Sequence, residues 1–278
     1  AASPGDLHPA TLARYNRCRE LMETVIRDVY NKEDVAFSKL NRKFITAFER
    51  YLKETCGLAR NTVAKYLECF RKVLKVAQQK GWMEHGKFLE ELGQLCVKEE
   101  TSPSFLNWDE LRTVMETDLP AGRLERVKDV FVFCALTGLS YQGVSTLCPS
   151  HLLRDDEGTL WICRTRAEGA EVGDSCTSRV PLLESAMVLL EKYRGWNPMN
   201  PEGPCFPVPS VQKMNEYLKE VAVRCRISKR LTTQMARNTF AATVTLANRI
   251  PKEHVREMLG YSSDYMLRHY MQAQKRNS

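Results

Sequence analysis

Apolar residues recur at helical spacing along most of this 278-residue chain, but between residues 150 and 181 they change to the short runs of β-strands. Strands are predicted at 151–154, 159–164 and 177–181, with a turn at Asp155-Asp156-Glu157-Gly158. Helical spacing returns after the third strand. The pattern therefore predicts a mainly α-helical chain with one small antiparallel β-sheet.

The first hundred residues are predicted to be helical throughout. Residues 11–29 contain no proline or glycine, and residues 40–55 carry apolar side chains at helical spacing. A third helix is predicted to begin at Asn61, a good N-cap residue, and to end at Gly81. A fourth is predicted over residues 87–98. These segments predict a helical bundle.

A polar segment at residues 98–103 ends in proline and breaks the helical periodicity. A chain of this length has room for two domains, each of roughly 100–200 residues. We therefore expect domains at residues 1–99 and 104–278. In the second, Asn107 is a predicted N-cap. Its helices are expected at 127–136, 184–193, 211–224, 233–248, 252–259 and 263–274.

Positive charge is concentrated in two parts of the chain. The net charge is +7, from 41 Lys and Arg against 34 Asp and Glu. Residues 42–80 hold ten basic and three acidic side chains, and residues 224–237 hold basic side chains and no acidic ones. Such clusters are typical of proteins that bind polyanions, although solvated helix faces give the same pattern.

Cysteine and hydropathy patterns argue against several other classes. The ten cysteines form no Cys-x-x-Cys pair, and the five histidines do not complete a zinc spacing. We expect no metal site, and reduced thiols in a cytoplasmic protein. The longest apolar runs are too short to span a bilayer, and no secretory leader opens the chain. It begins at Ala1 rather than methionine, which leaves room for an upstream region.

Two motifs in the second half of the chain carry the strongest functional indication. Arg237 lies in the run Leu231-Thr232-Thr233-Gln234-Met235-Ala236-Arg237-Asn238-Thr239-Phe240-Ala241, and Tyr270 follows 33 residues later, after Leu259-Gly260-Tyr261. Further motifs are Asn61-Thr62-Val63-Ala64-Lys65-Tyr66, Thr137-Gly138-Leu139-Ser140-Tyr141, Trp161-Ile162-Cys163-Arg164-Thr165-Arg166 and Val180-Pro181-Leu182-Leu183. In their order along the chain, these motifs resemble those of the tyrosine recombinases of the phage-integrase family, and especially those of the integrases of conjugative transposons.

The resemblance implies a helical, SAM-like core-binding domain followed by a catalytic domain that breaks and rejoins double-stranded DNA. Tyr270 would attack the scissile phosphorus, giving a 3′-phosphotyrosyl bond and a free 5′-hydroxyl, while Arg237 would hold the phosphate oxygens. No metal, ATP or other cofactor is expected. Self-association as a tetramer on DNA and accessory DNA-bending factors are implied. The expected DNA-contacting side chains are Arg60, Lys65, Arg71, Lys72, Lys128, Arg164, Arg166 and Arg230.

Three expected catalytic positions hold other residues. Gln234 replaces the histidine of the His-x-x-Arg box and cannot titrate, and Tyr261 replaces a later histidine or tryptophan but still offers a donor. Ser140 stands where the first arginine is expected. Lys128 or Arg126, from the preceding helix, could supply the missing cation, although a solvated salt bridge is equally compatible with either.

The fourth departure is the most serious, because Glu168 stands where the general-acid lysine is expected. An ionised carboxylate repels a phosphate and cannot donate a proton, and arginines such as Arg164, Arg166 or Arg179 are poor proton donors. Losing the acid and one charge-stabilising donor would slow cleavage by roughly four to seven orders of magnitude. Two hypotheses therefore remain, a site-specific recombinase and a recombinase-derived DNA-binding protein without cleavage. A helical protein-interaction module is a third, less favoured by the ordered motifs.

Overall fold

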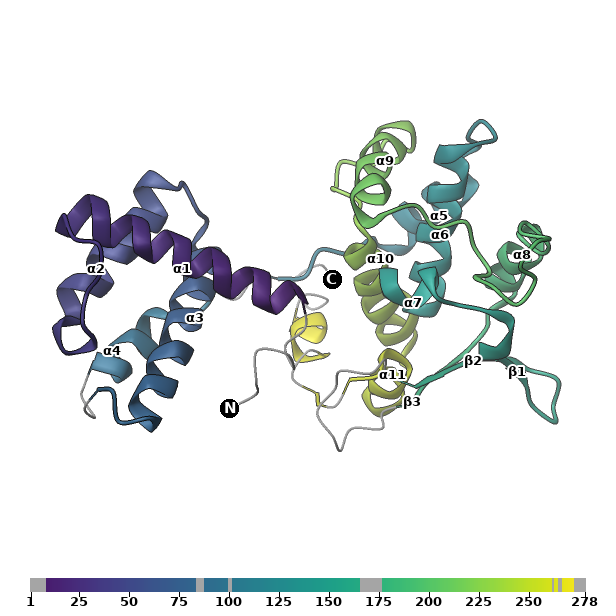
Figure 1. Ribbon diagram of the computed structural model, residues 1–278. Helices are drawn as coiled ribbons and strands as arrows, with labels where there is room; N and C mark the ends of the chain where they lie inside the picture. Colours follow the sequence, from purple (N-terminus) through teal and green to yellow (C-terminus); the bar gives the residue numbers. More distant parts are fainter. Residues whose placement is uncertain are drawn as a thin grey trace. The chain divides into compact units, whose positions relative to one another are not determined.

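The computed structural model describes residues 9–83, 88–99, 102–165, 177–261, 263–264 and 267–272. The chain divides into two compact units, residues 1–101 and 102–278, each with a hydrophobic core of its own. Figure 1 shows the elements of both units.

The first unit is a bundle of helices around buried apolar side chains. Its helices are α1 (Pro9–Tyr30), α2 (Arg42–Arg50), α3 (Arg60–Gln79) and α4 (Phe88–Leu95), with a short 3-10 helix, η2 (Phe37–Lys39), and a π-helical turn, η3 (Tyr51–Thr55). The apolar side chains on one face of α3 are buried, with Leu67 and Leu74 fully enclosed. This bundle is the helical first domain that the periodicity predicts.

One predicted helix start is wrong. The N-cap of α3 is Ala59, and Asn61 lies inside the helix. The Asn61 amide instead pairs with the backbone of Glu99, accepting from its N–H at 2.8 Å and donating to its carbonyl at 3.1 Å. Asn61 therefore holds the backbone at Glu99, near the end of the first unit. The same amide cannot also cap the helix, because its oxygen and nitrogen are already used in these two hydrogen bonds.

The second unit surrounds a buried helix. Helix α6 (Arg123–Thr137) packs against several others, and all of its residues from Val127 onward are buried. Its neighbours are α5 (Trp108–Glu116), α8 (Glu184–Lys192), α9 (Val211–Arg224) and α10 (Thr233–Thr239). The other helical elements are α7 (Tyr141–Ser145), η4 (Pro149–His151), η5 (Phe240–Thr245), η6 (Leu246–Asn248) and α11 (Lys252–Leu259), and residues 267–272 are also helical.

The three predicted strands form one antiparallel sheet. Strands β1 (Leu152–Arg154), β2 (Leu160–Thr165) and β3 (Thr177–Pro181) lie in the order β1-β2-β3. Asp155 stabilises the β1–β2 turn, because one carboxylate oxygen accepts from the N–H groups of Glu157 and Thr159 and the other from the Trp161 indole. The predicted fold class, mainly α with a small antiparallel sheet, is confirmed.

The helix predicted at 233–248 is continuous but changes type. It is α-helical to Thr239, π-helical in η5 and 3-10 in η6. The Thr245 hydroxyl donates to the carbonyls of Phe240 and Ala241, which is the back-bonding that loosens a helix. The periodicity of apolar residues does not distinguish such short segments from an α-helix, since each differs from it by less than one residue per turn.

The described part of the chain shows neither a membrane-spanning helix nor a cluster of metal ligands. None of its helices is long and apolar enough to cross a membrane. It likewise contains no group of three or more His, Cys, Asp or Glu side chains arranged to hold a metal ion. Its cysteines are free thiols.

Candidate functional site

Arg237 is held at the meeting point of three helices. From α10, its two terminal nitrogens donate to the carbonyls of Gly138, at the end of α6, and Leu259, at the end of α11. Gly138 and Gly260 terminate these helices with φ angles of 71° and 63°, a left-handed conformation that favours glycine. The two helix ends therefore fix the plane of the guanidinium.

Tyr261 lies against the same guanidinium. The Arg237 Nε–H donates to the Tyr261 hydroxyl at 3.3 Å, and the guanidinium carbon is 4.9 Å from the Tyr261 ring centroid. The Tyr261 hydroxyl is in turn 3.5 Å from that of Tyr270. Arg237, Tyr261 and Tyr270 thus form a continuous polar contact between residues that are far apart in the sequence.

Tyr270 is buried, with 2% of its surface exposed. It packs in a small core with Val180, Phe240, Leu259 and other apolar residues. Burial raises the pKa of the Tyr270 hydroxyl, and Tyr261 raises it further, whereas Arg237 and Gln234 lower it. In this state the phenol is protonated at neutral pH.

The Tyr261 hydroxyl lies between Arg237 and Tyr270, because it contacts both groups. The aromatic residue that replaces histidine or tryptophan here is long enough to bridge the two, and its hydroxyl finds polar partners in a half-buried site.

Asn238 completes the site and was missed by the sequence analysis. Its side-chain oxygen accepts from the Tyr270 hydroxyl and from Gln234 Nε2, both at 3.0 Å, and its nitrogen donates to the Ser104 carbonyl at 2.9 Å. Asn238 is 8% exposed. A buried asparagine in a helix needs hydrogen-bond partners for both the oxygen and the nitrogen of its amide. The presence of an asparagine among the apolar residues of this helix is the sequence signal that could have identified Asn238.

Ser140 and Gln234 lie nearer the surface, and both are exposed. Ser140 is the N-cap of α7, accepting from the Gly143 N–H at 3.1 Å. Arg164, from β2, donates to the Gly143 carbonyl and to the Thr146 hydroxyl. A basic side chain from the sheet therefore reaches the short helix that Ser140 begins.

The two cations expected to replace the first arginine have partners elsewhere. Lys128 is 9% exposed and donates to the Thr117 carbonyl at 2.8 Å, at the end of α5. Arg126 donates to the Gly122 carbonyl at 3.2 Å. The Lys128 contact is to backbone at the C-terminal end of α5, where the helix dipole favours a cation. The Arg126 contact is to the N-cap residue of its own helix, α6.

The basic side chains predicted to contact DNA differ in their surroundings. Lys65, Lys72 and Arg230 are exposed. Arg60 pairs with Glu99 at 2.5 Å, and Arg71 makes a two-point pair with Glu68 at 2.7 and 3.0 Å. Glu168 and Arg166 lie outside the described residues.

Comparisons with known proteins place this geometry in context. Residues 3–92 match the phage integrase SAM-like domain. No curated protein matches the chain by sequence. Among the solved structures that are similar over almost the whole chain are three complexes with DNA.

The Tn1549 transposon integrase in complex with transposon right end DNA superposes with a TM-score of 0.72 at 14% identity, covering 98% of this chain and 93% of that one. XerH site-specific recombinase bound to difH substrate gives 0.71 at 13%, with 96% and 79% covered. A lambda integrase dimer bound to a COC′ core site gives 0.70 at 13%, with 95% and 89% covered. At these identities the likeness shows a shared fold, which confirms the predicted architecture.

Proposed function

We propose that this chain is a tyrosine recombinase that acts as a site-specific DNA recombinase, because residues 3–92 match the phage integrase SAM-like domain and the fold is shared with the integrases and the recombinase compared above. Its reaction would be the transfer of a DNA phosphodiester to Tyr270 and then to a new 5′-hydroxyl. Integration or excision of a mobile element is the corresponding process.

The contact between Arg237, Tyr261 and Tyr270 carries this proposal. A guanidinium has five N–H groups, and Arg237 uses one on each of its three nitrogens for Gly138, Leu259 and Tyr261. One N–H therefore remains on each terminal nitrogen. Two donors held in one fixed plane can contact the oxygens of a phosphate.

The chemistry follows from this arrangement. The Tyr270 oxygen forms a bond to phosphorus as the bond from phosphorus to the 5′-oxygen breaks. The phenol loses one proton and the departing 5′-oxygen gains one, so that it leaves as a 5′-hydroxyl. Charge on the non-bridging oxygens would be stabilised by Arg237 and by the Tyr261 hydroxyl. The buried phenol must lose its proton during attack, because its pKa is raised in the free protein.

For DNA binding we propose that exposed cations of each unit neutralise phosphates. Lys65 and Lys72 on α3, and Arg230 before α10, are exposed and suited to this role. Arg164, on β2, whose side chain reaches α7, is suited to a phosphate near Ser140. Assembly as a tetramer on DNA, with accessory bending factors, belongs to the same proposal.

A nicked suicide substrate carrying the chain's own recombination site tests the proposal. Cleavage would trap a covalent protein–DNA adduct on a denaturing gel, and the adduct should disappear in Tyr270→Phe while DNA affinity is kept. Tyr30→Phe, in the first unit, is the matched control and should form adduct as the wild type does.

Absence of adduct with the wild type on DNA that it binds specifically would contradict the proposed reaction. In that case the protein is a DNA-binding protein without cleavage. Adduct that persists in Tyr270→Phe would show that another residue is the nucleophile.

A further inference from the structure

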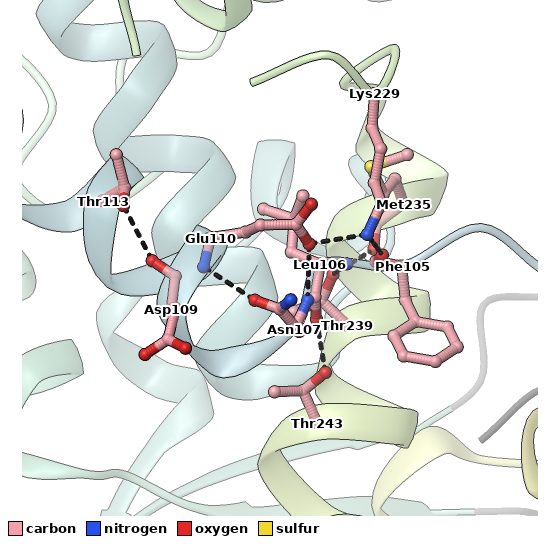
Figure 2. Close-up of polar contacts among 10 residues, drawn as sticks. All are labelled: Phe105, Leu106, Asn107, Asp109, Glu110, Thr113, Lys229, Met235, Thr239 and Thr243. Carbon is pink, nitrogen blue, oxygen red and sulfur yellow. Dashed lines mark hydrogen bonds and ion pairs between the residues drawn. The ribbon is translucent and has the colours of Figure 1, made fainter. Parts of the chain in front are cut away.

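Near the start of the second unit, the backbone at residues 105–107 is hydrogen-bonded to several side chains, and two of these, from α10 and η5, contact Leu106 (Figure 2). The Leu106 N–H donates to the Thr239 hydroxyl at 3.0 Å, and the Thr243 hydroxyl donates to the Leu106 carbonyl. Thr239 and Thr243 are both buried. The backbone around Leu106 is therefore fixed to the helix that carries Arg237.

A charged pair holds the same segment from its other side. The Lys229 ammonium donates to the Phe105 carbonyl at 3.0 Å and to Glu110 at 2.6 Å (Figure 2). Glu110 also accepts from the Asn107 N–H at 2.8 Å, within the capping box of α5. Residues 105, 106 and 107 therefore each make a backbone hydrogen bond to a side chain. These bonds also fix the position of the carbonyl of the preceding residue, Ser104.

The Ser104 carbonyl orients the amide of Asn238. Because the nitrogen of Asn238 donates to that carbonyl at 2.9 Å, its oxygen must face the other way, toward Tyr270 and Gln234. An amide oxygen only accepts hydrogen bonds. The Tyr270 proton therefore points at Asn238.

The direction of the Tyr270 proton decides where its lone pairs lie. With the proton on the Asn238 side, the lone pairs of the hydroxyl are left for the side of Tyr261 and Arg237. The Tyr261 hydroxyl, which accepts from Arg237 Nε, is then free to donate to Tyr270. The hydrogen bonds run in one sense, from Arg237 through Tyr261 and Tyr270 to Asn238.

We propose that Asn238 is a positioning residue for the nucleophile, and that its amide, oriented by the Ser104 carbonyl, turns the reactive lone pairs of Tyr270 toward the phosphate held by Arg237. This inference rests on the proposed recombinase function and extends it. Asn238 touches the nucleophile rather than the DNA, so it acts through Tyr270. Its removal should impair attack without weakening binding.

Two variants separate the contacts of Asn238. Asn238→Leu removes both the donor to Ser104 and the acceptor for Tyr270. Asn238→Asp removes the donor alone and keeps an acceptor, so the difference between the two variants reports the contact with Tyr270. Asn248→Ala is the matched control, because Asn248 ends the same run of helix and donates only to the carbonyls of Thr243 and Val244.

The first measurement uses the full chain without DNA. With tyrosine labelled at the ring carbon that bears the hydroxyl, the resonance of Tyr270 is identified by its loss in Tyr270→Phe. We expect this resonance to move in Asn238→Leu, to move less in Asn238→Asp, and to stay in place in Asn248→Ala. If it stays in place in both Asn238 variants, the positioning contact does not exist.

The second measurement is single-turnover adduct formation on the nicked substrate at saturating protein. Asn238→Leu should be slower by roughly tenfold to a hundredfold, the cost of misplacing a reacting group by about an ångström. Asn238→Asp should be less impaired, and its rate should recover at higher pH because an added anion disfavours the phenolate. The ionisable neighbours that act on Tyr270 in the wild type are Tyr261 and Arg237.

The outcomes distinguish this inference from the function it rests on. Equal losses in both Asn238 variants, with the same pH profile as the wild type, would indicate a merely structural role and overturn the proposal. If the wild type forms no adduct but the Tyr270 resonance responds to Asn238 as expected, the contact stands and the recombinase function fails.

Discussion

Gly138→Ala tests the geometry on which the Arg237 site depends. Gly138 has φ +71°, and a Cβ built there would lie 2.5 and 2.8 Å from the Phe240 ring and 3.0 Å from Leu259. The left-handed conformation costs an alanine about 1–2 kcal/mol, and overpacking costs about 1–3 kcal/mol more. We therefore expect a loss of about 2–5 kcal/mol in the free energy of unfolding of the second unit.

Gly195→Ala is the matched control because Gly195 has the same φ of +71° in the same unit, with nothing within 4 Å of the added Cβ. It should lose only the conformational part, about 1–2 kcal/mol. Urea unfolding followed by tryptophan fluorescence in a Trp82→Phe background reports the second unit, because the other tryptophans all lie there. If Gly138→Ala costs no more than Gly195→Ala, the close packing of Gly138 against Phe240 and Leu259 is refuted.

The remaining predictions concern DNA. Tyr261→Phe removes the hydroxyl between Arg237 and Tyr270 and should slow adduct formation roughly 10²–10³-fold; an unchanged single-turnover rate would exclude Tyr261 from the reaction. Lys72→Gln, at an exposed position, should reduce the slope of log affinity against log salt by about 0.9, whereas Arg71→Gln should change that slope less because Arg71 is already paired with Glu68. Fluorescence anisotropy titrations at several salt concentrations measure the slope, and equal slopes for the two variants would contradict this prediction. Glu168→Lys restores a proton donor and should raise the adduct rate, roughly within the 10²–10⁴ range of acid catalysis; no gain on cleavable DNA would show that residue 168 is not the acid position.

Local patterns predicted most of the architecture. The bounds expected for residues 211–224 and 252–259 are those of α9 and α11, because an apolar stripe and the residues at a helix end act over a single turn or two. Asn107 caps α5 with the capping box that its spacing from Glu110 permits. The sheet followed from three short runs and their turn for the same reason.

The motifs also indicated which residues to consider, although not how they are used. Arg237, Tyr261 and Tyr270 were named from the chain alone, and the structure brings them into one contact. Their roles stay predictions until adduct formation is measured. For Lys128, by contrast, the sequence was compatible with two roles, a catalytic cation and a solvated salt bridge. In the structure its ammonium group instead donates to backbone carbonyls at the end of α5.

Only the tertiary structure decided the partners of the polar side chains. Asn238 meets Tyr270 and Ser104 from positions 32 and 134 residues away, and Arg237 reaches the Gly138 carbonyl across 99. A hydrogen bond requires two atoms within about 3 Å in a suitable direction, and that distance between remote segments is set by how the helices pack. No residue pattern within a single helix contains it.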